Sequence, residues 1–221
     1  WLDRQAPIRK VAVSGTVGHT GPRELAHWLS GRLRGGFFTV DLTRLQAEVE
    51  GRPWIRSARI RGQWPDTLLL HVEEHRALAQ WSSGDGAWGL VGRDGSVFKT
   101  RASGDPGGLP RLTGPRDQLG TMVKRLGILQ EQLGKHRVSR VRVNPRGAWS
   151  VRVDDRVELR FGRRHWKERL ARFLQVERKW SLLERAVSRI DLRYPDGMAV
   201  ATAPEGAPGN RKTTEHPTNQ G

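Results

Sequence analysis

The chain has 221 residues, of which 36% are hydrophobic, a formal net charge of +16 and no cysteine. The lack of cysteine excludes disulfides, thiolate zinc sites and cysteine nucleophiles. The sequence also contains no run of about 20 apolar residues, the length that is needed to span a bilayer. The length suits one or two domains with buried cores, and we expect two.

The first 75 residues alternate between strand and helix signals. Apolar positions at strand spacing predict a strand over residues 8–14, ended by Gly15. Helical spacing then predicts a helix from Pro22 to Leu33 and a second helix capped by Asp41 that ends near Gly51. Residues 54–63 and 67–73 form a predicted hairpin around Trp64-Pro65-Asp66. The order strand, helix, helix, strand, strand predicts a compact α+β unit with both helices on one face.

The remainder of the chain is predicted to be a β-rich domain with two flanking helices. The helices are expected over residues 117–133 and 166–183. Alternating patterns and turn residues predict strands over 77–81, 88–91, 96–99, 138–143, 149–153, 156–161, 187–193 and 198–202. Residues 103–108 are expected to be a mobile connection, and residues 204–221, rich in Pro and Gly, a disordered tail.

Three patterns imitate catalytic or cofactor sites. The run from His71 to His75 matches H-x-x-E-H, but a zinc site needs both histidines on one helix, and here we predict a strand end. The run from Gly84 to Gly89 matches G-x-G-x-x-G, yet a strand and not a helix is expected to follow. Asp154-Asp155 is predicted to be a turn between two strands. We therefore predict no enzyme activity, no metal and no cofactor.

Tryptophan is abundant, with 9 residues, but six of them fall at apolar positions of predicted elements. These are Trp28, Trp54, Trp88, Trp149, Trp166 and Trp180. We expect core packing, and not base stacking, to account for most of them.

Several motifs in order resemble the FtsQ family of bacterial cell-division proteins. The most specific is the run from Pro53 to Ala79, in which a strand, a Trp-Pro-Asp turn and a second strand lead into Glu74-His75-Arg76-Ala77. Further similarities are Val13-Ser14-Gly15, the hairpin from Leu90 to Phe98, the run from Leu109 to Pro115, Leu159 to Gly162 and Ile190 to Tyr194. The resemblance covers residues 7–203 and implies a POTRA domain over 1–75 and a β domain over 76–203.

The resemblance implies a non-enzymatic scaffold at the division septum. Members of this family are single-pass inner-membrane proteins whose periplasmic part binds FtsB and FtsL and connects early and late divisome proteins. Because Trp1 is not a natural start residue, we expect an upstream segment that contains the membrane anchor.

The resemblance places two partner contacts on this sequence. The FtsB contact maps onto the end of the β domain, at Arg193, Tyr194, Asp196, Gly197, Met198 and Ala199. A final strand at a sheet edge could accept a partner segment as a further strand, with Tyr194 and Arg193 as anchors. An ordinary hairpin with Tyr194 packed inward is the alternative. The POTRA domain is expected to contact divisome partners around Ile60.

Two other functions remain open from the residues alone. The charge of +16 would suit a nucleic-acid-binding protein, although the arginines are spread over the whole length and not gathered in one stripe. A POTRA region of an outer-membrane transporter would need a long series of lipid-facing strands downstream.

Overall fold

The computed structural model describes residues 6–84, 88–98 and 108–202. The expected tail, most of the expected mobile connection and the tip of the first glycine turn lie outside these residues. The chain separates into two compact units, residues 1–125 and 126–221. This division falls within a helix, whereas the sequence places a domain boundary after residue 75.

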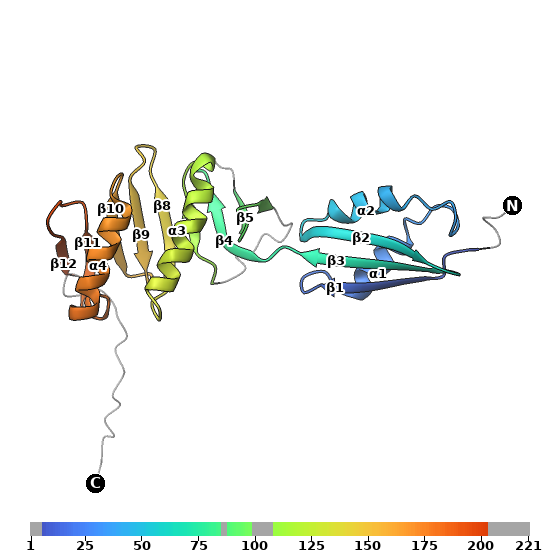
Figure 1. The fold of residues 1–221 in the computed structure, drawn as a ribbon, viewed down its shortest axis with the longest axis horizontal. Helices are drawn as coiled ribbons and strands as arrows, with labels where there is room; N and C mark the ends of the chain where they lie inside the picture. The colour runs from blue at the N-terminus through green and yellow to red at the C-terminus, as the bar shows by residue number, and fades with distance from the viewer. Residues whose placement is uncertain (1–5, 85–87, 99–107, 203–221) are drawn as a thin grey trace, which may run out of the picture. The chain divides into compact units, whose positions relative to one another are not determined.

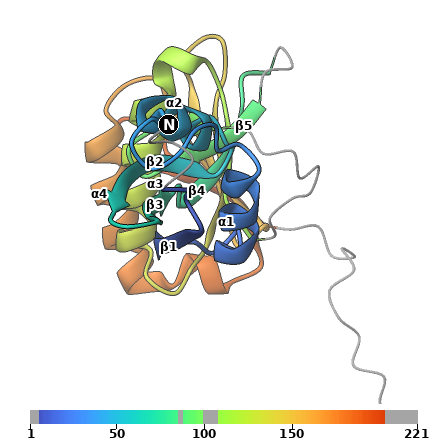
Figure 2. The same cartoon turned by 90° about the vertical axis from the view of Figure 1, so that its right-hand side faces the viewer.

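The first five elements form a three-stranded sheet with two helices. They are β1 (Lys10–Thr16), α1 (Pro22–Ser30), α2 (Leu42–Glu50), β2 (Ile55–Gln63) and β3 (Thr67–Glu74). The strand order is β1-β3-β2, with β1 parallel and β2 antiparallel to the central strand β3. Figures 1 and 2 show both helices on the same face of this sheet. The predicted β-α-α-β-β order of the POTRA-type region is confirmed.

The two helices begin where the sequence predicts and bury one apolar stripe each. Asp41 caps α2, since its Oδ1 accepts a hydrogen bond from the Arg44 amide at 2.9 Å. Helix α1 ends at Ser30 and not at Leu33, because Gly31 closes its last turn. The core of this region consists of Leu25, Leu29, Leu45, Val49, Ile55, Ala58, Ile60, Leu68, Leu70 and Val72.

Strand β1 continues through Gly15 to Thr16, so the prediction that Gly15 ends the strand is wrong. Gly15 has φ +106° and lies against β3 so closely that a Cβ atom there would be 2.0 Å from the carbonyl oxygen of Val72. Glycine is the residue that tolerates both this backbone conformation and this approach. Glycine often interrupts a strand, but here it is the residue that allows β1 to continue beside β3.

Residues 77–113 contribute four short strands to a large mixed sheet. They are β4 (Ala77–Ser82), β5 (Trp88–Gly92), β6 (Val97–Phe98) and β7 (Arg111–Thr113). Antiparallel pairs join β4 to β5 and β5 to β6, while β7 runs parallel to β4. Strand β7 was not predicted, because a three-residue strand after Pro110 has no alternating pattern to reveal it.

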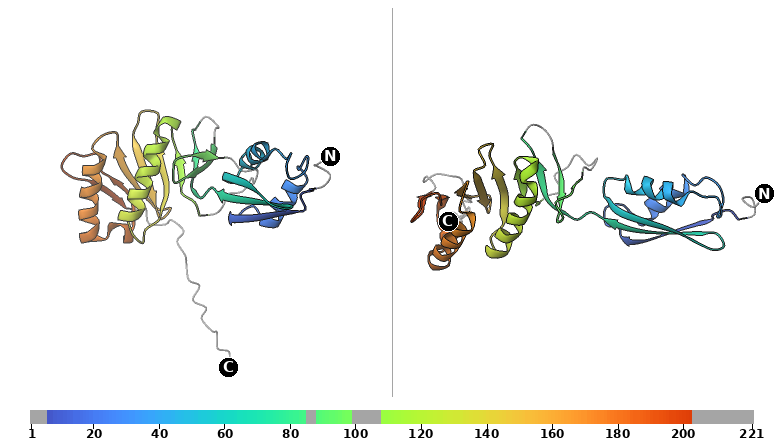
Figure 3. Two further views of the ribbon diagram at one scale, coloured as in Figure 1. Left: turned by 45° about the vertical axis from the view of Figure 1, so that its right-hand side comes forward. Right: turned by 45° about the horizontal axis from the view of Figure 1, so that its top comes forward.

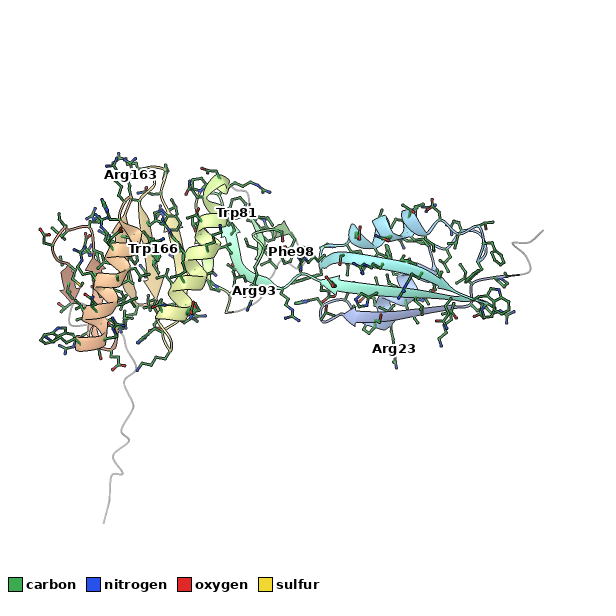
Figure 4. The ribbon with its side chains drawn as sticks, viewed as in Figure 1. Arg23, Trp81, Arg93, Phe98, Arg163 and Trp166 are labelled. Carbon is green, nitrogen blue, oxygen red and sulfur yellow. The ribbon has the colours of Figure 1, made fainter. Side chains whose placement is uncertain are left out.

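A carboxylate holds the end of β3, and stacked rings hold the junction that follows it. Glu74, at the end of β3, accepts hydrogen bonds from the amides of Gly18, His19 and Thr20 at 2.8–2.9 Å. The ring of His19 stacks on Trp54 with centroids 3.6 Å apart. Trp54 meets Phe98 edge-on at 5.4 Å, and His75 stacks on the same Phe98 at 4.3 Å. Figure 4 labels Phe98 at this junction.

The second unit contains five strands and the helix that precedes the last two. They are β8 (Val138–Val143), β9 (Trp149–Val153), β10 (Val157–Gly162), α4 (Trp166–Trp180), β11 (Val187–Asp191) and β12 (Ala199–Thr202). Helix α3 (Leu119–Gln132) crosses the division between the units and follows the short 3-10 turn η2 (Arg116–Gln118). Strands β8, β9 and β10 are antiparallel neighbours, β11 is parallel to β10, and β12 is antiparallel to β11.

Helix α4 covers one face of these strands (Figure 3). Phe173 and Leu170 of α4 are buried, and Trp166 lies 5.0 Å from Phe161 of β10, ring to ring (Figure 4). The helix ends at Trp180 and not at Leu183, because Ser181 adopts a left-handed conformation, φ 46°, before the 3-10 turn η3 (Leu182–Glu184). The predicted class, α+β with a mixed sheet and flanking helices, is confirmed.

Candidate functional site

Among the described residues, strand β12 is the last of its sheet, with β11 as its one neighbour in the strand order. Val200 of β12 pairs across the strands with Ile190 of β11. Ile190 is completely buried, whereas Val200 is 45% exposed. An edge strand presents backbone N–H and C=O groups that can pair with another chain. The structure thus places Ala199 on an edge strand, as expected, with an uncovered apolar side chain beside it.

The turn before β12 exposes the expected aromatic residue. Tyr194 is 54% exposed, so the alternative in which it packs inward is wrong. Asp196 is also exposed, while Gly197 and Met198 are half-buried. A Cβ atom on Gly197 would meet nothing within 4 Å, so the turn leaves open space next to the edge strand.

Arg193 is bound to Asp191 at the end of β11. Its Nη2 lies 2.6 Å from Asp191 Oδ2, and its Nε lies 2.9 Å from Oδ1. The hydrogen bonds from Arg193 hold the pKa of the Asp191 carboxyl below its usual range, although burial of the carboxyl opposes this shift. The charge of Arg193 is therefore partly compensated, although its side chain remains 57% exposed.

Two arginines of α4 hold the turn in place. Arg172 donates to the carbonyl oxygens of Pro195 and, at 3.0 Å, Tyr194. Arg169 donates to the carbonyl oxygens of Phe161 and, at 3.0 Å, Arg193. Sequence reasoning missed both residues. Their spacing of three along a helix was a signal that they share a face, but nothing indicated that this face meets the turn.

A basic hollow of about 320 Å³ lies on the other face of the sheet. Its lining includes Arg142, Arg160 and Arg193, together with Ser150 and Glu158. Arg160 forms an ion pair with Glu158 at 3.1 Å. In the described parts of the chain, Arg142 makes no ion pair. The alternation of valine and arginine along β8 and β9 produces this face, since every second side chain points away from the core.

Ile60 lies on β2, which is an edge strand of the first sheet. Its side chain is buried, with 8% exposure, and belongs to the core below α1 and α2. Its neighbours Arg59 and Arg61 are exposed on the opposite face. A partner could reach Ile60 through its backbone, whereas a side-chain contact would have to come from the arginines.

The H-x-x-E-H run lies on β3 and just after it, as predicted. His71 Nδ1 is 3.2 Å from the hydroxyl of Ser14, whereas His75 stacks on Phe98. The described residues contain no group of three or more histidine or carboxylate side chains that could hold a metal ion.

The other two patterns also have structural roles. In the G-x-G-x-x-G run, the described residues Trp88 and Gly89 start strand β5, as expected. Asp154 and Asp155 form the turn between β9 and β10, both with positive φ.

No helix in the described parts of the chain is long and apolar enough to cross a membrane.

The expectation that core packing accounts for most of the six tryptophans has two exceptions. Trp149 is buried, but Trp88 is 47% and Trp180 is 50% exposed. Trp180 is the last residue of α4, and the chain turns at Ser181 directly after it.

Comparisons with known proteins match both halves of the chain. A family model described as cell division protein FtsQ/DivIB, C-terminal, matches residues 79–193, and one described as POTRA domain, FtsQ-type, matches residues 6–75. The cell division protein FtsQ of Allochromatium vinosum is 36% identical over 207 residues, which cover 92% of this chain and 81% of that protein. The FtsQ protein of Nitrosospira multiformis is 34% identical over 200 residues, 89% of this chain and 82% of that protein.

Proposed function

Because the chain belongs to the FtsQ/DivIB family of cell-division proteins, we propose that it is a non-enzymatic scaffold that binds FtsB and FtsL in the periplasm. In this role it links early and late division proteins at the septum. Residues 1–75 act as the POTRA domain and residues 76–203 as the β domain. The boundaries of the two family matches, at residues 75 and 79, support this division.

The proposed location is the inner membrane, with a single span upstream of this region and the described residues in the periplasm. Family membership supports this location. A chain without cysteine also folds independently of the redox state of its compartment, which is compatible with an oxidising periplasm.

The proposed site for FtsB is strand β12 and the turn before it, comprising Arg193, Tyr194, Asp196, Gly197, Met198 and Ala199. The observation that carries this proposal is the exposed Tyr194 beside an edge strand whose Val200 lacks a cover. A partner segment that adds as a strand would pair its backbone with β12 and place an apolar side chain over Val200. Tyr194 would then contact the segment where it enters the sheet.

The positive charge beside the proposed site suggests that the partner segment carries a carboxylate. The basic hollow around Arg142 and Arg160 borders Arg193, which is part of the proposed site. A carboxylate on the partner, next to its strand-forming residues, would meet these arginines. Such charge pairs speed association and set the register more than they add affinity.

The proposed POTRA contact is the β2 edge around Ile60. Because the Ile60 side chain is buried, a divisome partner would bind the backbone of β2 and the exposed side chains of Arg59 and Arg61. This contact is independent of β12 and can be tested separately.

Titration of a peptide from the C-terminal part of FtsB onto this chain tests the main site. We expect Tyr194→Ala and Val200→Asp each to weaken binding at least about tenfold, as central interface residues do. Gly197→Glu should weaken it as well, since it fills the open space of the turn. Trp180→Ala is the matched control, because it removes an aromatic side chain of similar exposure. Equal binding by the Tyr194, Val200 and Trp180 variants would refute the site.

Nucleic acid is the second candidate partner, favoured by the net charge of +16 and by the arginine-rich sheet face. A purely electrostatic association with duplex or single-stranded DNA should disappear over a salt series up to physiological ionic strength. Binding that survives with sequence preference would support this alternative. An outer-membrane transporter is not proposed further, because both parts of the chain match the FtsQ family.

A further inference from the structure

The two most exposed large apolar side chains among the described residues lie at one end of the POTRA region. Trp64 is 73% exposed and Phe38 is 64% exposed. Trp64 is in the β2–β3 turn, and Phe38 is in the connection between α1 and α2. We name this end, formed by residues 6–9, 31–40 and 61–66, the aromatic pole.

Hydrogen bonds and ring contacts join the three segments of the aromatic pole. The Phe37 amide donates to the carbonyl oxygen of Ala6 at 2.9 Å, and the Arg9 amide donates to that of Asp66 at 2.8 Å. Phe37 also meets Phe38 edge-on at 5.4 Å. A Cβ atom on Gly62 would lie 3.0 Å from the Phe37 ring, so β2 approaches this ring closely. Figures 1 and 3 show the start of β1 beside the tip of the β2–β3 hairpin.

The charge around the two aromatic side chains is predominantly positive. Arg34 and Arg61 are exposed and make no ion pair within the described residues, and Arg9 adds a third cation. The acidic groups nearby are engaged in local structure. Asp66 Oδ1 accepts a hydrogen bond from the Thr67 hydroxyl at 3.1 Å, and Asp41, next to the pole, caps α2.

We propose that the aromatic pole docks onto the surface of an anionic lipid bilayer. Tryptophan and phenylalanine insert favourably at the boundary between head groups and acyl chains, and arginines beside them pair with anionic head groups. A Trp and a Phe on a turn and a loop could insert a short distance into the head-group region of the bilayer. Exposing two large aromatic side chains to water at one end of the protein is unfavourable, and a binding surface would account for it.

This proposal goes beyond the scaffold function and concerns how the POTRA region is oriented. If the chain is anchored in the inner membrane as proposed above, the described chain enters the POTRA region at the aromatic pole, through Ala6 and Pro7. Docking would then hold this end, including Arg61, at the bilayer and leave the β2 edge from Ile55 to Ile60 free. Binding of this chain to vesicles does not require the upstream anchor.

Vesicle flotation with the whole chain tests the proposal. Wild type and the variant Phe38→Ser/Trp64→Ser are mixed with vesicles of phosphatidylglycerol and phosphatidylethanolamine at physiological salt. We expect the double variant to bind at least about tenfold more weakly, because two aromatic side chains no longer enter the interface. The matched control is Trp88→Ser/Trp180→Ser, which removes two half-exposed tryptophans elsewhere and should bind as wild type does. Circular dichroism checks that both variants are folded.

A site-specific label distinguishes insertion from attraction by the overall charge. Because the chain has no cysteine, Gln63→Cys and Thr16→Cys each accept one environment-sensitive fluorophore. Gln63 and Thr16 lie at opposite ends of the first sheet, since β3 pairs with them at Thr67 and Glu73. The fluorophore at position 63 should brighten and shift to the blue with anionic vesicles, and less with phosphatidylcholine, while that at position 16 should not respond.

Two outcomes would overturn the proposal. One is equal vesicle binding by wild type and by Phe38→Ser/Trp64→Ser, and the other is binding of the chain without a response at position 63. Either would mean that the net charge alone attracts the chain to lipid. Titration of the FtsB peptide onto the same double variant should be unchanged, so failure of lipid docking can be distinguished from failure of the scaffold function.

Discussion

Glu74, at the end of β3, binds the backbone of His19 within the POTRA region. Its Oε2 accepts the His19 amide at 2.9 Å, and the same carboxyl group accepts the amides of Gly18 and Thr20. Burial of this carboxyl opposes its ionisation. The three amide hydrogen bonds outweigh that effect and hold the pKa of Glu74 below its ordinary value of 4.5.

Replacement of Glu74 by alanine should destabilise the chain by about 2 to 4 kcal/mol, because three amides lose a charged acceptor. Urea unfolding at pH 7 measures the loss. Glu73→Ala is the matched control, since the Glu73 side chain is exposed and has one weak hydrogen bond, to Ser57 at 3.3 Å. A similar loss in both variants would contradict the role assigned to Glu74.

Acid should weaken the contact of Glu74 with these three amides. A carboxyl group whose folded pKa lies below its unfolded pKa contributes stability above the unfolded value, and that contribution is lost as the pH falls through the folded pKa. We therefore expect the stability difference between wild type and Glu74→Ala to be constant near neutrality and to shrink below about pH 4.5. Urea unfolding from pH 7 to pH 3 checks this, and a difference that grows in acid would refute it.

Gly15→Ala should destabilise the POTRA region by more than about 3 kcal/mol, because the new Cβ would overlap the Val72 carbonyl oxygen and the backbone there has φ +106°. Gly120→Ala is the matched control. A Cβ at Gly120 meets nothing within 4 Å, and the residue lies in α3, where alanine is favoured by about 1 kcal/mol. Thermal unfolding of the two variants should move in opposite directions.

Arg172→Ala should weaken partner binding without unfolding the chain. The substitution removes the donors that hold the carbonyl oxygens of Tyr194 and Pro195, so the turn before β12 loses its fixed position. We expect at least a fivefold loss of affinity for the FtsB peptide, with retained secondary structure by circular dichroism. Arg178→Ala, on the same helix and exposed, serves as control. Unchanged affinity of Arg172→Ala would show that the turn does not need this support.

The two residues of the β9–β10 turn should respond differently to substitution. Asp154→Ala should cost about 1 to 2 kcal/mol, since Asp154 accepts hydrogen bonds at 2.7 Å from the Arg137 amide and from His136. Asp155→Gly should cost less than Asp154→Ala, because it loses an exposed ion pair with Arg137 and a hydrogen bond with Ser139 but relieves a φ of 53°. Chemical denaturation of both variants checks the order.

Local patterns in the sequence predicted most elements because each carries its own signal. Asp41 marks the start of α2, and alternating valines and arginines mark β8 and β9. The errors occur where one residue outweighs the pattern. Ser181 adopts a left-handed conformation and ends α4 although apolar residues continue beyond it, and Gly15 extends a strand that it was expected to end.

The candidate site was only partly predictable for a different reason. Tyr194 and its neighbours are contiguous, so a single motif brought them together. Arg172 and Arg142 come from a helix and a strand that are distant in sequence from the turn, and their side chains meet the site only through the fold. The burial of Ile60 likewise depends on which face of β2 the helices cover.

The central place of β3 has a mechanical consequence. This strand pairs with β1 on one side and β2 on the other, and the chain passes from its end at Glu74 to β4 within three residues. Tension transmitted along the chain through β4 would thus act on the middle strand of the POTRA sheet, parallel to its length. Two ladders of hydrogen bonds would resist it together in shear, whereas an edge strand can be peeled off one bond at a time.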